Sequence, residues 1–296
     1  MGRKQPAQPG KNPTGRPAGP KQAACAVAAE RFIGGMSPPR TLDAVQAASA
    51  AQFDRQSDRY GKSHILADTS DVAAALAGVP AGGAALDVAT GGGHTALYLA
   101  KQGWRVTAGD LAPRMLENAR RLAAEAGCPI ETRLFPAEEF PFPPHSFELV
   151  TVRVAPHHFS SPEKFVAEVA RVLKPGGHFL LIDGSVPDDD PATEAWLHRV
   201  EKLRDPSHGR FLARGAWEAL VKAQGLTVLT SSLTPLKQPD LQWYFETAAT
   251  PAENRAQVLE EVRTIPPPVR AALRLGEEAG RIVWWWPRLA LLARRA

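Results

Sequence analysis

The chain has 296 residues, of which 44% are hydrophobic, and a formal net charge of +4 at pH 7. This length and apolar content suffice for one large domain or two small ones, each with a hydrophobic core. No apolar run reaches the roughly 18 residues that a membrane-spanning helix needs, so no segment is predicted to cross a membrane.

Residues 1–40 differ in composition from the rest of the chain. They are rich in proline and glycine and contain seven Lys or Arg residues but one acid, Glu30, a net charge of +6. Taking +6 from +4 leaves −2 for residues 41–296, so the domain itself gives no electrostatic reason to expect a nucleic-acid partner. The composition predicts a disordered basic tail, with a basic arm for an anionic surface as the functional alternative.

The two cysteines, Cys25 and Cys128, are not spaced as metal ligands. They favour a reducing, cytoplasmic location and predict no metal site.

The hydrophobic pattern of the domain predicts helices and strands in alternation. Pro113 and Gly127 mark the start and end of one helix, and Ser161 opens another. Helices are expected over residues 41–55, 69–76, 95–101, 114–126, 161–173, 193–203, 214–224 and 252–263, and strands over 84–88, 104–108, 130–134, 147–152, 177–182 and 226–230. Strands separated by helices indicate a parallel sheet covered on both faces.

A glycine loop follows the first predicted strand, in the sequence L-D-V-A-T-G-G-G-H of residues 86–94. The second strand then ends near Asp110, nineteen residues after Gly91. Glycines let the backbone approach a ligand closely, and a carboxylate at this place can accept both hydroxyls of a ribose. The layout predicts a site for a nucleoside-containing cofactor.

The glycine loop alone leaves two classes of cofactor open. Gly91, Gly93 and Ala96 also satisfy the G-x-G-x-x-G/A pattern of dinucleotide-binding folds, so an NAD-dependent oxidoreductase is an alternative. A phosphate-binding P-loop is excluded because no Gly-Lys-Ser/Thr follows.

Two further motifs have no role in the dinucleotide pattern: the D-x-A-x-G-x-G run at 87–93 and L-K-P-G-G at 173–177. Together with Asp110 they resemble the class I S-adenosylmethionine-dependent methyltransferases, and most of all the ubiquinone/menaquinone-biosynthesis C-methyltransferase type and its bacterial relatives. The resemblance covers residues 52–229. It implies an α/β, doubly wound, mostly parallel seven-stranded sheet with helices on both faces, in a single domain over residues 41–296.

The resemblance also assigns the two halves of the domain. Residues 52–183 would hold the cofactor, and residues 184–296 would supply the acceptor-binding helices and the last strands. Residues 281–293 would form the last strand, antiparallel beside the sixth, where Pro287 predicts a bulge or a broken ladder.

On this resemblance S-adenosyl-L-methionine is the expected cofactor, and Asp110 is expected to bind its ribose. Asp87 would order the glycine loop, which includes Ala89, and reach the amino-acid end of the cofactor. Side chains at Gly91 or Gly93 would collide with the ligand.

The adenine would lie between two short segments. Leu111 and Met115 are expected on one side, although apolar residues four apart are as often plain core. On the other side, Pro136 stands where relatives carry a polar residue, which leaves the Ala137 amide and Glu138 to read the ring edge.

The segment after the fourth strand, Arg153 to Phe159, should face the sulfonium end of the cofactor because ligands lie beyond the carboxyl ends of parallel strands. It lacks the Asn/Asp-Pro-Pro-Tyr/Phe motif of adenine-methylating enzymes, which argues against a DNA substrate. His157 or His158 could act as a general base, or both could be structural.

A run of charged and hydrogen-bonding residues follows the helix at 193–203. Arg204, Ser207 and His208, with Trp243 and Tyr244 further on, are expected to bind the acceptor; the alternative is a structural turn opened by an Asp-Pro pair. Residues 52–60 resemble the segment that relatives fold over the donor, with Phe53 and Tyr60 as its apolar contacts.

The sequence therefore predicts an enzyme that methylates carbon or oxygen of a small, aromatic or quinone-like acceptor. An NAD-dependent oxidoreductase and a non-catalytic, cofactor-binding regulatory module are the alternatives.

Overall fold

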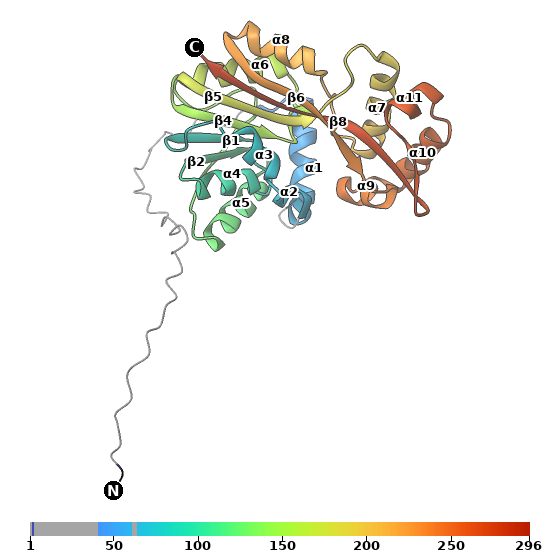
Figure 1. Cartoon of the computed structure of the whole chain (residues 1–296), viewed down its shortest axis with the longest axis horizontal. Coiled ribbons are helices and arrows are strands. Elements are labelled where there is room, and N and C mark those ends of the chain that lie inside the picture. The colour runs from blue at the N-terminus through green and yellow to red at the C-terminus, as the bar shows by residue number, and fades with distance from the viewer. Residues whose placement is uncertain (1, 3–40, 61–63) are drawn as a thin grey trace.

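The structure is a computed structural model that describes residues 41–60 and 64–296, together with the isolated Gly2 (Figure 1). The predicted tail, including Cys25, lies outside the described residues. So do the side chains of residues 58–60, and with them the predicted contact of Tyr60.

The strands form one sheet with a short addition. Their bounds are β1 (Ala84–Val88), β2 (Arg105–Asp110), β3 (Glu131–Leu134), β4 (Phe147–Arg153), β5 (Leu173–Gly184), β6 (Leu226–Gln238), β7 (Gly276–Glu278) and β8 (Arg281–Arg295). The order across the sheet is β3-β2-β1-β4-β5-β8-β6, and β7 pairs only with β8. The five strands β1 to β5 pair in parallel, whereas β8 runs antiparallel between β5 and β6. The predicted doubly wound, mostly parallel sheet is confirmed.

Helices cover both faces of this sheet. Their bounds are α1 (Ala44–Tyr60), α2 (His64–Ala67), α3 (Ser70–Ala75), α4 (His94–Lys101), α5 (Pro113–Glu125), α6 (Pro162–Val172), α7 (Pro191–Arg204), α8 (Arg214–Ala223), α9 (Leu241–Ala248), α10 (Ala252–Arg263) and α11 (Pro267–Ala272), with a 3-10 turn at Pro156–His158. No helix in the described part of the chain combines the length and apolarity needed to cross a bilayer.

The alternation of side chains along the strands builds a core on each face. Leu86 and Val88 of β1 pack with α6 and α8, while Ala85 packs on the opposite face with α3 and α4. Since both faces are covered, successive residues of the central strands β1 and β4 are nearly all buried, as expected for the middle of a parallel sheet.

A third core lies beyond one end of the sheet, where α7, α9, α10 and α11 gather (Figure 1). Trp196, Tyr244 and Trp284 are buried in it. Helices α9 and α11 were not predicted, and β6 runs on to Gln238 instead of ending near residue 230.

The predicted bulge at Pro287 is wrong. The ladder between β6 and β8 continues through a Pro235–Pro287 pair, and its irregularity lies between Val228 and Thr230. Pro287 uses its carbonyl to accept from the backbone N–H of Ser185, so its nitrogen also faces β5. Because β5 ends at Gly184, the missing donor interrupts nothing.

Candidate functional site

A pocket opens at the carboxyl ends of β1, β2 and β4, under α1. Its space, including the part open to solvent, is about 920 Å³. Residues from the glycine loop, the β2 end, the β3–β4 loop, the β4 end and α1 line it: Gln46, Ser49, Ala50, Phe53, Leu66, Ala89, Thr90, Gly91, Gly92, His94, Thr95, Asp110, Leu111, Ala112, Met115, Phe135, Ala137, Glu138, Arg153, Val154, Ala155, His158 and Phe159. This is the edge where ligands of open α/β sheets bind.

Asp110 lies on the pocket wall at the end of β2. Its Oδ2 accepts from the Gly91 N–H at 2.8 Å and its Oδ1 from the Ala112 N–H at 2.9 Å. Each carboxylate oxygen has a second lone pair, so two acceptor positions remain for a ligand. Burial raises the pKa of this carboxyl, and the two backbone donors oppose that rise.

Asp87 is buried but does not line the pocket. Its oxygens accept from the Thr90 hydroxyl at 2.6 Å and the Thr151 hydroxyl at 2.7 Å. Burial raises its pKa to about 6. These contacts agree with the predicted ordering of the glycine loop but give no direct contact with a ligand's amino-acid end.

The two glycines of the loop differ in what surrounds them. Gly91 lines the pocket, and a Cβ there would meet no atom within 4 Å. Gly93 has φ +87° and does not line the pocket; its Cβ would lie 2.7 Å from the backbone of Ala119 in α5. The predicted collision of a Gly93 side chain with the ligand is replaced by a collision with a helix. Ala89, also on the pocket, has φ +51°.

The predicted adenine walls lie on the pocket as a group: Leu111, Met115, Ala137 and Glu138. The Glu138 carboxylate, however, is occupied by protein donors. Its Oε1 accepts from the Ser160 N–H at 2.8 Å, and its Oε2 accepts from Gln46 Nε2 at 2.8 Å. Glu138 thereby joins α1 to the rim of the pocket.

Arg153 also lines the pocket, with its guanidinium directed at the segment between α2 and α3. It donates to the carbonyl oxygens of Leu66 and Asp68 at 2.8 and 2.5 Å and to Asp71 Oδ2 at 3.0 Å. Arg288 of β8 shares the same Asp71 carboxylate. Arg153 therefore fixes one wall of the pocket.

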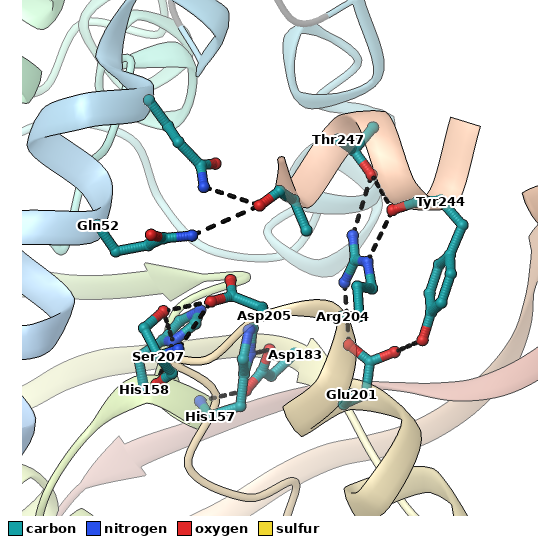
Figure 2. A network of polar contacts seen from close by, with 12 residues as sticks. Gln52, His157, His158, Asp183, Glu201, Arg204, Asp205, Ser207, Tyr244 and Thr247 are labelled. Carbon is teal, nitrogen blue, oxygen red and sulfur yellow. Dashed lines mark hydrogen bonds and ion pairs between the residues drawn. The ribbon is translucent and has the colours of Figure 1, made fainter. Parts of the chain in front are cut away.

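The structure separates the roles of the paired histidines (Figure 2). His158 lines the pocket, and its ring meets Phe53 edge-on with centroids 4.8 Å apart. Burial and the neighbouring His157 lower its pKa to about 3, so it is neutral near pH 7.

His157 does not line the pocket. Its Nδ1 lies 2.7 Å from Asp183 Oδ1, and its backbone N–H donates to Asp183 Oδ2 at 2.9 Å. Burial works against the charged ring, but the charge and hydrogen bond of Asp183 outweigh it and raise the pKa. Asp183 follows the strand predicted at 177–182 and lies one residue before the end of β5; its contact with His157 was not predicted from the sequence.

The predicted acceptor-binding residues all lie away from the pocket lining. Arg204 stacks on Tyr244, 4.5 Å from the ring centroid, and pairs with Glu201 at 2.9 Å, while the Tyr244 hydroxyl donates to the same carboxylate (Figure 2). Trp243 lines a separate shallow depression between α9 and β8.

Ser207 and His208 are buried in the loop after α7. Ser207 touches His158 from outside the pocket lining, and His208 packs against His157 with centroids 5.4 Å apart. Of the predicted acceptor residues, Ser207 thus lies within hydrogen-bond distance of His158 in the pocket, and the His208 ring lies edge-on to that of His158.

Helix α1 supplies three pocket residues that the sequence did not single out, Gln46, Ser49 and Ala50, beside Phe53, which was predicted as an apolar contact of the donor. Gln46 and Ser49 face the site three residues apart, and Phe53 follows after one more turn, which is the spacing of one helix face. The spacing of Gln46 and Ser49 on one helix face can be seen in the sequence. The sequence does not show which part of the chain that face contacts.

Comparison with known proteins agrees with this geometry. A family model described as "Methyltransferase domain" matches residues 86–181. The "Uncharacterized methyltransferase YcgJ" of Bacillus subtilis (strain 168) is 34% identical over 212 residues, which are 70% of this chain and 82% of that protein. The "Ubiquinone/menaquinone biosynthesis C-methyltransferase UbiE" of Desulfotalea psychrophila is 37% identical over 115 residues, covering 38% of this chain and 46% of its own.

A solved structure is similar over most of the domain. The crystal structure of the YcgJ protein from Bacillus subtilis superposes with a TM-score of 0.70 at 28% identity, covering 79% of this chain and 99% of that chain. The chain belongs to the family of S-adenosylmethionine-dependent methyltransferases.

Proposed function

We propose that the pocket binds S-adenosyl-L-methionine, and the observation that carries this is Asp110. Its carboxylate stands on the pocket wall directly after β2, beside the Gly91 amide, with lone pairs left for two ribose hydroxyls. Gly91 lets the backbone approach, since its Cβ position is open space on the pocket side. The donor set suits a nucleoside. Among the described residues of the pocket lining, the one Lys or Arg side chain is Arg153, and its guanidinium is bonded to Leu66, Asp68 and Asp71, so the lining offers no unengaged cation for a pyrophosphate.

Leu111 and Met115 would pack on the adenine, with the Ala137 amide at the ring edge. Ala89 and Arg153 border the opposite end, where the amino-acid part would lie. Asp87 acts through Thr90 and Thr151, which hold the loop in shape.

We propose a small aromatic or quinone-like molecule as the methyl acceptor, methylated on carbon or oxygen. The wall near His158 is apolar, formed by Ala50, Phe53, Ala155 and Phe159. Such a surface suits a planar, uncharged molecule. The relative UbiE, whose name refers to quinone biosynthesis, supports the same class. The buried Ser207 and His208 would then shape this end of the pocket from behind His158, while Arg204, Trp243 and Tyr244 belong to the neighbouring helical core.

The bound donor supplies an electrophilic methyl group on a sulfonium. The chain's own contribution is to hold that group and the acceptor in line within a pocket covered by α1, which lowers the barrier through orientation. His158 is neutral and would face the acceptor. His157 is held in place by Asp183 and packs against the His158 ring. The chain's two cysteines, which are not spaced as metal ligands, favour action in the cytoplasm.

Thermal denaturation separates this proposal from its NAD-dependent alternative. S-adenosylhomocysteine at about 100 times its Kd should stabilise the protein by roughly 2.7 kcal/mol and raise Tm by about 5–10 °C. NAD should leave Tm unchanged. A shift with NAD and none with S-adenosylhomocysteine would refute the cofactor assignment. Transfer of labelled methyl from S-adenosylmethionine to a panel of phenols and quinols, against a panel of amines and nucleic acids, tests the acceptor class.

A further inference from the structure

The loop after α7 reaches His158 with two oxygen atoms of Ser207 (Figure 2). His158 Nδ1 lies 3.1 Å from the Ser207 carbonyl oxygen and 3.3 Å from the Ser207 hydroxyl oxygen. Asp205 in turn binds Ser207 twice: its Oδ1 accepts from the Ser207 hydroxyl at 2.6 Å and from the Ser207 N–H at 2.9 Å. All three residues are buried.

These contacts leave one consistent placement of hydrogens. A carbonyl oxygen only accepts, so the bond to the Ser207 carbonyl requires a hydrogen on His158 Nδ1. The Ser207 hydroxyl has a single hydrogen, and the short bond to the Asp205 carboxylate uses it. The hydroxyl oxygen therefore faces Nδ1 with its lone pairs, and both neighbours of Nδ1 require the same hydrogen.

We propose that Asp205 and Ser207 are positioning residues that hold His158 as the neutral Nδ1–H tautomer and so present the lone pair of Nε2 to the methyl acceptor. The imidazole ring directs Nε2 away from the Nδ1 side, and His158 lines the pocket. Within the described residues, Nε2 has no protein hydrogen-bond partner.

A lone pair at this place selects an acceptor that carries an O–H or N–H group beside the methylated atom. The contact is a hydrogen bond to the ligand, and no proton transfer to His158 is part of the inference. It rests on the proposed function only in placing the methyl acceptor beside His158; the tautomer itself is a property of the protein alone.

The charges around His158 agree with a neutral ring. The His157 ring, which contacts Asp183, has its centroid 4.1 Å from that of His158. A positive charge on His157 therefore disfavours a second positive charge on His158. Arg204 also disfavours a charged His158 ring, whereas Asp205 and the hydrogen bond to the Ser207 carbonyl favour it. Burial outweighs both and keeps the pKa low. A neutral imidazole has one N–H, and the Ser207 carbonyl accepts a hydrogen bond from it.

The experiment is a two-bond 1H–15N spectrum of the side chains in the full chain labelled with 15N-histidine, without ligand. The His158→Gln spectrum assigns the His158 signals by their absence. We expect a protonated Nδ1 and an unprotonated Nε2, unchanged between about pH 5 and pH 8. A protonated Nε2, or an imidazolium at pH 7, would overturn the inference.

Two variants test the positioning residues in the same spectrum. Asp205→Ala frees the Ser207 hydroxyl hydrogen to donate to Nδ1, so the Nδ1 signal should move toward the unprotonated position. Asp205→Asn keeps an oxygen that accepts from Ser207 and should preserve the wild-type tautomer. If Asp205→Ala, folded by circular dichroism, retains the wild-type signals, Asp205 has no positioning role.

Binding of S-adenosylhomocysteine distinguishes this inference from the proposed function. Both Asp205 variants should bind it within about twofold of wild type, because the donor contacts lie on the glycine loop and Asp110. A wild-type protein that shows the expected tautomer but fails to bind S-adenosylhomocysteine would refute the proposed function alone.

Discussion

Asp87 is the penultimate residue of β1 and Asp110 is the last residue of β2; both are buried, yet only Asp110 faces the pocket. In the parallel register Asp87 stands opposite Ala108 and Val88 opposite Gly109, so Asp110 projects one residue beyond the β1 edge. Thr151, from the strand on the other side, takes one oxygen of Asp87. The sequence marks both acids; the cross-strand hydroxyl that occupies Asp87 follows only from the pairing of β1 with β4.

The loop glycines give a matched pair of substitutions. Gly93→Ala places a Cβ 2.7 Å from the Ala119 backbone at φ +87°, so we expect a loss of about 1–3 kcal/mol of stability. Gly91→Ala faces open space at φ +53° and should lose about 1 kcal/mol, while weakening S-adenosylhomocysteine binding. Urea denaturation and calorimetry measure the two effects. Equal stability loss in both variants would contradict this difference in surroundings.

The low pKa of His158 predicts a pH dependence of stability. Its folded pKa, about 3, lies below the unfolded value of about 6.5. Below about pH 6.5 the unfolded chain takes up a proton that the folded chain excludes, so the free energy of unfolding falls as the pH decreases toward 3. The slope should reach about 1.4 kcal/mol per pH unit from this group.

The matched control removes a histidine from the surface. His158→Gln should lessen the loss of stability between pH 6.5 and pH 5, measured by urea denaturation, whereas His145→Asn, at an exposed position, should not. His157 contributes with the opposite sign: its raised pKa adds stability below pH 6.5 that is lost as pH rises through the folded value. Identical slopes for wild type and His158→Gln would show that His158 is not held neutral.

At the scale of elements, α1 is the part that covers the pocket. Gln56 donates to the Ala248 carbonyl at the end of α9 at 2.8 Å, Gln52 donates to it at 3.4 Å (Figure 2), and Gln46 holds Glu138. The Arg114 N–H and Asn118 Nδ2 of α5 also donate to Asp54 Oδ1 and to the Ser57 carbonyl, at 3.3 and 2.8 Å. Each of these contacts involves a side chain, whereas backbone ladders join the strands, so opening of α1 should cost less than opening of the sheet.

Hydrogen exchange tests this covering role. If the ligand leaves only when α1 opens, S-adenosylhomocysteine at about 100 times its Kd should slow exchange in α1 up to about 100-fold. Gln56→Ala should speed exchange of α1 without ligand, and β5, which does not line the pocket, serves as the internal control. Equal protection of α1 with and without ligand would show that it does not cover the bound donor.

The elements that the sequence predicted well are those with a local signal. The helices opened by Pro113 and by Ser161 begin where the proline and the capping serine place them, because these features act within one turn. Helix α9 was missed although Asp240 caps it by accepting from the Trp243 N–H at 2.7 Å. Its apolar face meets β8, far along the chain, and the sequence does not show that contact.

The site residues also differ in whether a local sequence signal or a distant contact sets their position. Asp110 and Gly91 could be identified because a loop of fixed spacing builds their place. The sequence did not show that Arg204 and Tyr244 lie away from the pocket lining, because their burial in the Glu201 network depends on how α7 and α9 pack.

At the scale of the molecule, the sheet and the helical core are joined by the two longest strands. β6 and β8 pair from Leu226 to Gln238, past the ends of the parallel strands, and carry Trp284 and Trp286 into the core around α7 and α9 (Figure 1). The loop after α7 returns from this core to His158. Under the proposed function the helical core would therefore lie behind the acceptor end of the pocket, and the glycine loop would serve the donor end.

Isothermal titration of S-adenosylhomocysteine into wild type and Asp110→Ala tests the central claim most directly. We predict one site in the wild type and an affinity about 10- to 150-fold weaker in Asp110→Ala, equivalent to roughly 1.5–3 kcal/mol for hydrogen bonds to a charged group. Asp188→Ala is the control, since that carboxylate serves Gly215 and Arg214 outside the pocket and its loss should leave the affinity unchanged. Equal affinity of wild type and a folded Asp110→Ala would contradict the account.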